Sequence, residues 1–329
     1  LGGACAGEVA GSAPPASTGA ARHTEPARTE TASAPGAVPL CGSLVGTPVD
    51  VRSVVVIVME NHSYGRVIGA AGSVAARGAP YLNGTLKKRC GLATGFRAIT
   101  HPSLPNYIGM VAGTRGGIVD DCTSCSTTVS SLFGQLRRAG RQWRVYAEGM
   151  PERCSQRSVG RYVKLHNPAT YFPAIAADCR RWDLPMGGST GYLDRALRND
   201  NLQAFSMVVP DMCNSMHDCS VATGDAWLRR WVPRIAAAPS YRSGHTVVFV
   251  VWDEGSGGSG GENCLKQSGD ESCHIPAFVV SALTPAGARS STRFSLYSTL
   301  RTTESLLGLP RRLGKAATVT GMRPDFGLR

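Results

Sequence analysis

Apolar residues in this chain occur either as short continuous runs or at the spacing of an amphipathic helix. A continuous run predicts a buried strand at 54–59, and strand-like, mostly apolar segments predict further strands at 143–147, 205–209 and 246–252. Helical spacing predicts helices at 130–140, 192–199 and 226–238, each before one of the last three strands. This alternation predicts an α/β fold, a three-layer sandwich whose central, mostly parallel sheet is covered by helices on both faces.

The first 40 residues lack this pattern and are rich in Ala, Pro, Ser, Thr and Gly, which is typical of a flexible tether. We therefore expect a tether over 1–40 and one folded domain over 41–329. The opening LGGAC resembles the end of a bacterial lipoprotein signal, with Cys5 as the lipid-bearing residue, although Leu1 lies one place too far away.

No apolar run reaches about 18 residues, so no membrane-spanning helix is expected. Because the chain begins at Leu1 without a recognisable leader, we expect a signal peptide to have been removed or to be missing.

Acidic residues follow four predicted strands at the point where each strand ends. Glu60 follows the first, Glu148 the second, Asp211 the third, and Asp253 with Glu254 the fourth. The carboxyl ends of parallel strands share one edge of the sheet, where open α/β folds bind ligands. Ionised carboxylates gathered there repel each other and need cations. The pattern predicts a metal site, whereas one such acid alone would more simply cap the following helix.

Ser103 lies in ITHPSLPNYIGMVAGT, before a helix-like stretch that begins near Pro105. The start of a helix offers free amide donors and the positive end of the helix dipole, which hold an anionic group well. A serine there becomes a nucleophile if a metal lowers its pKa. In isolation, the same serine would be interpreted as a helix cap.

Eleven cysteines are many for a cytosolic protein. Without Cys5, ten remain, enough for five disulfides, although sequence does not determine their connectivity. A zinc cluster is less consistent with the chain, because the CxxC at 122–125 has no second CxxC partner. The cysteine usage predicts export to an oxidising compartment. Short spacings suggest three bridges: Cys122 with Cys125, Cys213 with Cys219, and Cys264 with Cys273.

The chain is strongly basic: 35 Lys and Arg residues against 23 Asp and Glu residues give a formal net charge of +12. Such a surface can simply be soluble, or it can attract phosphorylated substrates or an anionic membrane surface. No dense Lys/Arg block or basic stripe with aromatic residues appears, so no specific nucleic-acid site is predicted. Composition says nothing about oligomeric state.

Five motifs, in order, carry a family resemblance. Together they are similar to the bacterial phosphoesterase family of secreted acid phosphatases and phospholipase C enzymes, a branch of the alkaline phosphatase superfamily. The resemblance runs from about Val51 to Leu309. It implies an alkaline-phosphatase-like fold with a metal site at the sheet edge and a serine or threonine nucleophile. The motifs are ENHSYG from Glu60, HPSLPNY from His101, HNPATYF from His166, VVWDEG from Val250 and HIPAFVVS from His274.

The resemblance also implies roles for single residues. Ser103 stands where superfamily members with a T-x-P-N stretch keep the nucleophile. Glu60 and Asn61 match the first acidic strand end, and Asp253 with Glu254 match the later pair. These four side chains would surround the metal that activates Ser103.

A second set would complete the reaction. Asp211, His217 and His274 resemble the Asp, His and His that bind a second metal in two-zinc members, and His217 or His274 would help water to hydrolyse a phosphoserine. Asn106 and the helix amides would face the equatorial phosphoryl oxygens. His166 would approach the leaving group or the phosphate oxygens, or would instead cap a helix or support the ligands.

Two departures from the two-zinc pattern leave the metal open. Five residues rather than three separate Asp211 from His217, and Glu254 occupies a position that is His in two-zinc enzymes. Oxygen ligands fit Ca²⁺, Mg²⁺ or Mn²⁺ as well as Zn²⁺. The glycine-rich stretch 255–264 has no P-loop lysine and is interpreted as a flexible loop over the site.

We therefore expect a secreted or envelope-attached, metal-dependent phosphoric-ester hydrolase. A phosphomonoesterase of acid phosphatase type is favoured, because the chain is compact and no lipid-binding domain follows. Phospholipase C action on a phospholipid headgroup is the alternative. A catalytically silent surface-binding protein is a third reading, disfavoured by the presence of Ser103 with every proposed carboxylate. A sulfatase is disfavoured, because the C-x-P-x-R stretch is absent.

Overall fold

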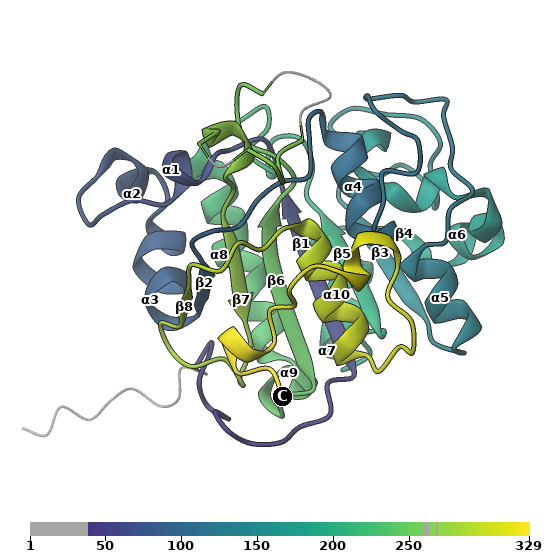
Figure 1. Ribbon diagram of the computed structural model, residues 1–329. Coiled ribbons are helices and arrows are strands. Elements are labelled where there is room, and N and C mark those ends of the chain that lie inside the picture. The colour runs from purple at the N-terminus through teal and green to yellow at the C-terminus, as the bar shows by residue number, and fades with distance from the viewer. Residues whose placement is uncertain (1–38, 259–262, 268) are drawn as a thin grey trace, which may run out of the picture. The chain divides into compact units, whose positions relative to one another are not determined.

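The structure, a computed structural model, describes residues 39–258, 263–267 and 269–329 (Figure 1). Its centre is an eight-stranded sheet in the order β4-β3-β5-β1-β6-β7-β2-β8. Among these strands β7 alone runs antiparallel to its neighbours, β6 and β2. The expectation of a mostly parallel sheet is confirmed. The strands are β1 Ser53–Met59, β2 Gly91–Ala93, β3 Trp143–Ala147, β4 Asp183–Pro185, β5 Phe205–Val209, β6 Thr246–Trp252, β7 Ala277–Val280 and β8 Arg289–Ser290.

Strand β1 lies in the interior of the sheet between β5 and β6. Val54 pairs with Phe205 on one side and with Val247 on the other. All seven residues of β1 are buried, and so are all seven of β6. Continuous rather than alternating apolar runs result, because both faces of a parallel sheet are covered.

Helices cover both faces of the sheet, as Figure 1 shows with α10 in front of the strands and α8 behind them. The predicted helices at 130–140, 192–199 and 226–238 correspond to α5, α7 and α8. The helices are α1 Tyr64–Val67, α2 Val74–Gly78, α3 Lys87–Arg89, α4 Ser103–Ala112, α5 Leu132–Arg138, α6 Ala176–Trp182, α7 Tyr192–Arg198, α8 Val221–Ala237, α9 Pro239–Arg242 and α10 Leu296–Leu306. Short 3-10 turns include η2 Lys164–His166, η3 Pro168–Tyr171 and η5 Glu271–Cys273.

Helix α4 begins at Ser103 itself, two residues earlier than the pattern suggested. Pro105 falls in its first turn, where the missing amide hydrogen has no cost. Gly113 ends the helix with a φ of 71°, and a Cβ there would lie 2.0 Å from the Leu313 carbonyl oxygen. Glycine is therefore required at this C-terminus.

Five disulfides lie within the described ranges. The three bridges suggested by spacing are confirmed, and two more join Cys41 to Cys90 and Cys154 to Cys179. Cys5, most of the predicted tether, and residues 259–262 of the predicted loop lie outside the described residues. Of the helices described, none has the length and apolar character needed to cross a membrane.

Candidate active site

Four adjacent strands, β3, β5, β1 and β6, point their carboxyl ends to one edge of the sheet, as the strand-end acids predicted. Met59 pairs with Trp252, so the residues that follow, Glu60 and Asp253, lie next to each other. Both carboxylates are fully buried. Strand register alone therefore brings two acids together at the centre of this edge.

The carboxylates oppose each other's ionisation. Burial, and then the charge of Asp253, raises the pKa of Glu60 well above its usual value. Burial, and then the charge of Glu254, raises the pKa of Asp253 to about 8. Burial also raises the pKa of Glu254, against the lowering effect of His101. Such a group of acids favours a bound cation.

Asn61 joins the two strand ends. Its φ of 44° lies in the left-handed region, which asparagine tolerates, and its backbone amide donates to Asp253 Oδ1 at 3.2 Å. In one orientation its side-chain oxygen accepts from Ser103 Oγ at 3.4 Å. In the other, its nitrogen donates to Glu60 Oε2 at 3.0 Å, and its oxygen accepts from His217 Nε2 at 3.3 Å. The amide is thus at the centre of the cluster.

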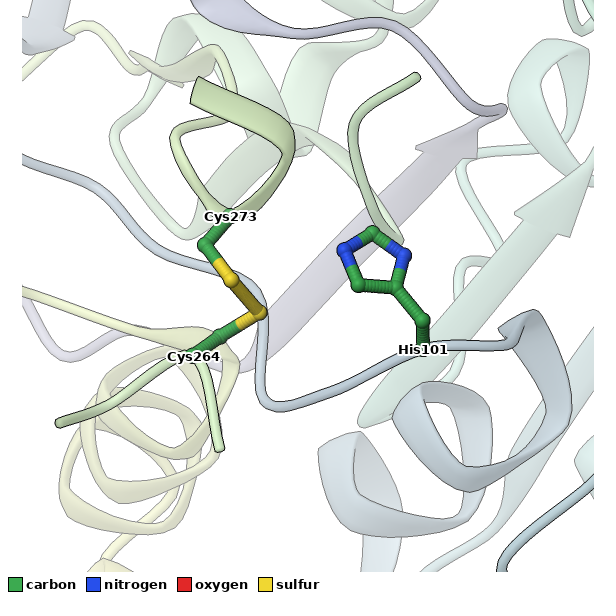
Figure 2. Close-up of side chains that lie close together, drawn as sticks. All are labelled: His101, Cys264 and Cys273. Carbon is green, nitrogen blue, oxygen red and sulfur yellow. A yellow bond between two sulfur atoms is a disulfide. The ribbon is translucent and has the colours of Figure 1, made fainter. Parts of the chain in front are cut away.

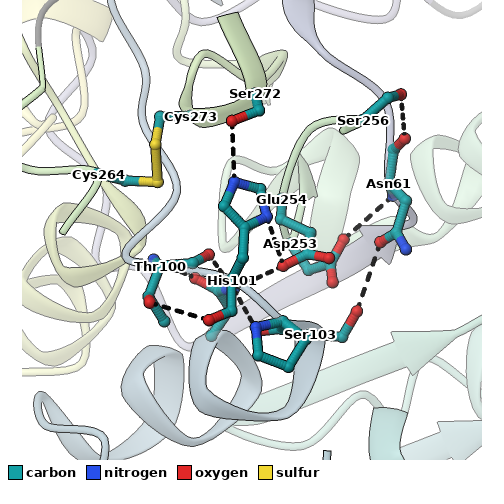
Figure 3. Close-up of polar contacts among 12 residues, drawn as sticks. Asn61, Thr100, His101, Ser103, Asp253, Glu254, Ser256, Cys264, Ser272 and Cys273 are labelled. Carbon is teal, nitrogen blue, oxygen red and sulfur yellow. Dashed lines mark hydrogen bonds and ion pairs between the residues drawn. A yellow bond between two sulfur atoms is a disulfide. The ribbon is translucent and has the colours of Figure 1, made fainter. Parts of the chain in front are cut away.

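Ser103 is the first residue of α4 and is almost fully buried (Figure 3). Besides its contact with Asn61, its hydroxyl faces Asp253 and opposes the rise in the pKa of that carboxyl. The next amide, that of Leu104, donates to Asp121 Oδ1 at 2.9 Å. A carboxylate therefore occupies one of the amide donors that we expected to hold an anionic group.

Tyr107 lies one helical turn after Ser103 and faces the same cluster. Its hydroxyl donates to Glu60 Oε1, and its ring stacks on His166 with centroids 5.3 Å apart. His166 Nδ1 lies 3.4 Å from the same Glu60 oxygen. Burial, with a smaller contribution from His217, lowers the pKa of His166 to about 3, so this ring is neutral. Sequence reasoning missed Tyr107, although its i, i+4 spacing from Ser103 was a usable signal.

His101 supports Glu254 from the opposite side. His101 Nδ1 lies 3.0 Å from Glu254 Oε2, and its Nε2 lies 3.1 Å from Ser272 Oγ. The Ser272 hydroxyl donates in turn to Asp270 Oδ1 at 2.6 Å. A chain of polar contacts therefore runs from Glu254 to the loop that ends in η5.

The disulfide between Cys264 and Cys273 closes that loop beside His101 (Figure 2). The two sulfurs and a ring nitrogen of His101 lie within 4.8 Å of one another. Because the sulfurs are bonded to each other, they are not thiolate ligands, and the bridge serves as support. Gly258 also contacts the ring: a Cβ there would lie 2.1 Å from His101 Nε2.

His217 reaches the cluster from a loop closed by the disulfide between Cys213 and Cys219. Its Nδ1 lies 2.7 Å from Asp218 Oδ1, which leaves Nε2 directed at Asn61. The bridge and the carboxylate together fix the ring. The arrangement suits a group that gives or takes a proton at Nε2.

Two of the residues proposed from sequence as metal ligands make other contacts. Asp211 Oδ1 accepts from the amides of Cys213 at 3.0 Å and Asn214 at 2.8 Å, so it caps a turn. His274 Nε2 lies 2.8 Å from the Thr94 carbonyl oxygen, and its ring stacks on Tyr64. No hydrogen bond or ion pair within the described ranges joins either side chain to Glu60 or Asp253.

Asn106 lies behind the cluster rather than facing the space beside Ser103. Its side-chain oxygen accepts from the amides of Ile99 and Thr100, at 2.9 and 3.2 Å. Its nitrogen donates to the carbonyls of Thr100 and Pro102 at 2.8 and 3.1 Å, and faces Glu254 Oε2 at 3.4 Å. The amide that we expected at the phosphoryl oxygens instead holds the loop before α4.

The cluster fits a divalent cation. Glu60, Asn61, Asp253 and Glu254 offer carboxylate and amide oxygens around the Ser103 hydroxyl, and the raised pKa values show how poorly the acids tolerate ionisation without a positive charge. These donors suit Ca²⁺, Mg²⁺ or Mn²⁺ and also admit Zn²⁺, so they do not select one metal.

Comparison with known proteins agrees with this geometry. Residues 92–310 match the model of the Phosphoesterase family. The chain belongs to the phosphoesterase family. It is therefore a hydrolase that acts on phosphoric esters, with a phosphorylated substrate.

Curated relatives of this phosphoesterase are phosphatases. The chain is 30% identical over 278 residues to a phosphatidylinositol-3-phosphatase of Mycobacterium tuberculosis, covering 84% of this chain and 83% of that protein. It is 28% identical over 172 residues to an acid phosphatase of Aspergillus fumigatus, covering 50% of this chain and 38% of that protein. The chain thus spans well under half of that fungal relative.

Solved structures show the same fold at low identity. A protein of the alkaline phosphatase superfamily from Vibrio parahaemolyticus aligns with a TM-score of 0.53 and 14% identity, covering 87% of this chain and 74% of that one. A phosphonate monoester hydrolase of Agrobacterium radiobacter aligns with a TM-score of 0.54 and 12% identity, covering 84% and 77%. The expected alkaline-phosphatase-like fold is confirmed. The five disulfides indicate an oxidising, extracytoplasmic compartment.

Proposed function

We propose that this phosphoesterase is an exported, metal-dependent phosphomonoesterase that uses Ser103 as its nucleophile. The observation that carries the proposal is the position of Ser103 Oγ, at the start of α4, 3.4 Å from the Asn61 side chain and beside the buried carboxyl of Asp253. The relatives named above are phosphatases, which favours a monoesterase over a phospholipase C. The retention of the complete carboxylate cluster speaks against a silent binding protein.

Each group in the cluster has a task in this proposal. A divalent cation held by Glu60, Asn61, Asp253 and Glu254 would lower the pKa of the Ser103 hydroxyl and offset the negative charge of the phosphoryl group. Ser103 Oγ bonds to phosphorus while its proton passes to the neighbouring carboxylate of Asp253. The ester oxygen leaves with the bonding electron pair.

His217 serves the leaving group and the second half of the reaction. Its Nε2 faces the cluster, so it can protonate the departing alcohol and then take a proton from the water that cleaves the phosphoserine. Ser103 Oγ leaves phosphorus with the bonding electron pair and takes back the proton held by Asp253, so phosphate and the free serine result. Tyr107 and His101 act through the carboxylates that they contact.

Phosphate release from p-nitrophenyl phosphate tests the proposal, after chelation and readdition of single divalent metals. We expect one or more metals to restore activity, and Ser103→Ala to lower kcat by at least about a thousandfold. Ser256→Ala is the matched control, because the Ser256 hydroxyl donates to the Asn61 carbonyl at 2.6 Å without reaching the proposed reaction centre. It should keep kcat within about tenfold of the wild type.

The result that would overturn the nucleophile assignment is a folded Ser103→Ala protein with kcat close to that of Ser256→Ala. Full activity after exhaustive chelation would instead refute the metal requirement. Circular dichroism of each variant separates loss of chemistry from loss of fold.

A phosphoinositide is a second candidate substrate, favoured by the relative from Mycobacterium tuberculosis, which aligns over most of both chains. Removal of the 3-phosphate from phosphatidylinositol 3-phosphate is also monoester hydrolysis, so the same cluster would serve. Phosphate release from a soluble short-chain form of this lipid, compared with p-nitrophenyl phosphate, measures the preference. A lower kcat/KM for the lipid would count against it.

A further inference from the structure

A cavity of about 710 Å³, outside the cluster described above, has a strongly basic wall. It includes four cationic side chains, Arg153, Arg157, Lys164 and Arg180, against the single acidic side chain of Glu152. Glu152 Oε1 lies 3.9 Å from Arg157 Nη2, and both side chains are largely exposed. An exposed contact of this length neutralises little charge. The cavity therefore carries a surplus of positive charge.

Two short segments connect this cavity to the candidate active site. Turn η2 places Lys164 in the cavity wall and, two residues later, His166 against Glu60. Lys164 Nζ donates to the Thr123 carbonyl at 2.6 Å, and Asp121, two residues before Thr123, accepts from the amide that follows Ser103. The segments 121–125 and 164–166 thus each contribute residues both to the cavity wall and to contacts with the candidate active site.

Lys164 is the unusual member of the wall, because it is only 5% exposed. Its ammonium group contacts the Thr123 carbonyl and the ring of Tyr171, whose centroid lies 4.5 Å away. Within the described ranges no carboxylate lies at ion-pair distance from it. A buried cation without a counter-charge is costly. An anion in the cavity would supply that charge.

Two disulfides hold the wall in place. The bridge between Cys154 and Cys179 contributes both of its residues to the lining, and the bridge between Cys122 and Cys125 contributes Cys125. Arg153 and Arg180 directly flank the two cysteines of the first bridge, so their backbone positions are fixed before a ligand arrives. Preorganised cations bind an anion at a lower entropic cost.

We propose that this cavity is a second anion subsite, which binds a further phosphate group on the leaving alcohol while Ser103 attacks the first. The inference rests on the proposed function and narrows its substrate class to monoesters of polyphosphorylated alcohols. Inositol phosphates have this chemistry, either free in solution or as the headgroup of a membrane lipid.

Binding to the Ser103→Ala protein tests the subsite independently of turnover. Inositol 1,4,5-trisphosphate is the probe, and inorganic phosphate at matched ionic strength is the reference ligand. We expect Arg157→Gln/Arg180→Gln to weaken trisphosphate binding by at least about tenfold, since two exposed cations leave the wall. Lys164→Met should weaken it too, while Lys164→Arg retains most of the affinity.

Arg242→Gln/Arg311→Gln is the matched control, because it removes the same charge at exposed positions that do not line the cavity. In the protein that retains Ser103, Arg157→Gln/Arg180→Gln should keep kcat/KM for p-nitrophenyl phosphate within about threefold of the wild-type value, since that ester has no second phosphate. The proposal would be overturned if Arg157→Gln/Arg180→Gln and Arg242→Gln/Arg311→Gln bound inositol 1,4,5-trisphosphate with equal affinity. It would also be overturned if the Ser103→Ala protein bound the trisphosphate no more tightly than inorganic phosphate.

Vesicles distinguish the two sources of the ligand. Phosphatidylcholine vesicles containing phosphatidylinositol 4,5-bisphosphate are compared with vesicles of equal charge containing phosphatidylserine. A cavity-dependent preference for the former assigns a lipid-borne substrate, and binding confined to the soluble trisphosphate assigns a free one. Either result supports the subsite. Trisphosphate binding without any ester hydrolysis by the wild type would refute the proposed function alone.

Discussion

The hydroxyl of Tyr107 affects the pKa of a buried carboxyl group, that of Glu60. Its hydrogen bond lowers the pKa of Glu60 against the stronger raising effects of burial and of Asp253. Tyr107→Phe removes this donor and keeps the ring that stacks on His166. We expect the metal concentration for half-maximal phosphatase activity to rise by about 10- to 100-fold, because groups that orient a ligand matter nearly as much as the ligand.

Tyr81→Phe is the control for this change. Tyr81 is also buried, and its hydroxyl has no hydrogen-bond partner among the described residues. The control should leave the metal requirement unchanged. If both variants need the same metal concentration as the wild type, Tyr107 does not position a metal ligand.

The buried carboxyl of Asp183, which lies outside the candidate site, should make the stability of the protein depend on pH. Burial raises its pKa to about 8, although Asn167 Nδ2 donates to it at 2.8 Å. Between about pH 4 and pH 8 the folded protein retains a proton that the unfolded chain releases, so stability falls as pH rises, by at most about 1.4 kcal/mol per pH unit. Above the folded pKa this contribution no longer changes.

Asp183→Asn should abolish this part of the pH dependence, because an amide resembles the neutral acid and cannot ionise. Urea unfolding from pH 5 to pH 8 measures it as the difference in unfolding free energy between variant and wild type. We expect the difference to move in favour of the variant as pH rises. A difference that stays constant would show that the folded Asp183 has an ordinary pKa.

At the scale of elements, the loop closed by Cys264 and Cys273 holds the support of Glu254. Ser272 within it contacts His101, and the Cys264 amide donates to the Ile99 carbonyl before α4. Cys264→Ser/Cys273→Ser should therefore lower kcat by about tenfold or more, because Glu254 and the start of α4 lose a common support. The bridge spans nine residues, so the loss of stability should be roughly 2–3 kcal/mol.

Ser272→Ala separates the two parts of this effect. It removes the contact with His101 and keeps the disulfide. We expect a smaller fall in kcat and little change in unfolding free energy. An unchanged kcat in the bridge variant, measured on folded protein, would show that the loop does not support the site.

The longer elements followed from sequence because apolar periodicity reports burial. Strands β1, β3, β5 and β6 are mostly apolar, with Arg144 in β3 and Ser206 in β5, and their ends carried the acids that predicted a shared sheet edge. The short strands β2, β4 and β8 have two or three residues and no periodicity of their own. They exist because longer neighbours offer hydrogen-bond partners, which a local pattern does not record.

The local apolar pattern likewise predicts only part of the candidate site. Glu60, Asn61 and Asp253 come together because strand register follows from the apolar pattern. The contacts of His101 and Asp121 depend on loops whose paths the pattern does not predict. Asp211 and His274 were proposed as ligands by resemblance, and in the structure their side chains hydrogen-bond to nearby backbone groups.

At the scale of the whole molecule, composition gives the net charge but not the place where the positive charges gather. The net charge of +12 predicts attraction to anions without locating it. The fold brings together cations from positions 153 to 180, which are spread thinly in sequence, in one cavity wall that also contains cysteines of two disulfides. A dense basic block is therefore not needed to make a basic site.

The disulfide between Cys41 and Cys90 fastens the beginning of the described fold to the side of the sheet formed by β7, β2 and β8. Cys90 directly precedes β2, and the Leu44 amide donates to the Ala282 carbonyl just beyond β7. The bridge spans 49 residues, so the chain-entropy relation assigns it about 4 kcal/mol. Cys41→Ala/Cys90→Ala should lower the unfolding free energy by at least that amount, since Cys90 is fully buried.

Cys122→Ala/Cys125→Ala is the comparison, because this bridge closes a loop of three residues and restricts the unfolded chain much less. The same relation assigns it roughly 2 kcal/mol. Equilibrium unfolding in guanidinium chloride, with the other four bridges intact, measures both variants. Equal losses of unfolding free energy in the two variants would mean that the unfolded chain is already compact, so that the bridge between Cys41 and Cys90 restricts it little. The sheet would then hold this side of the molecule without that bridge.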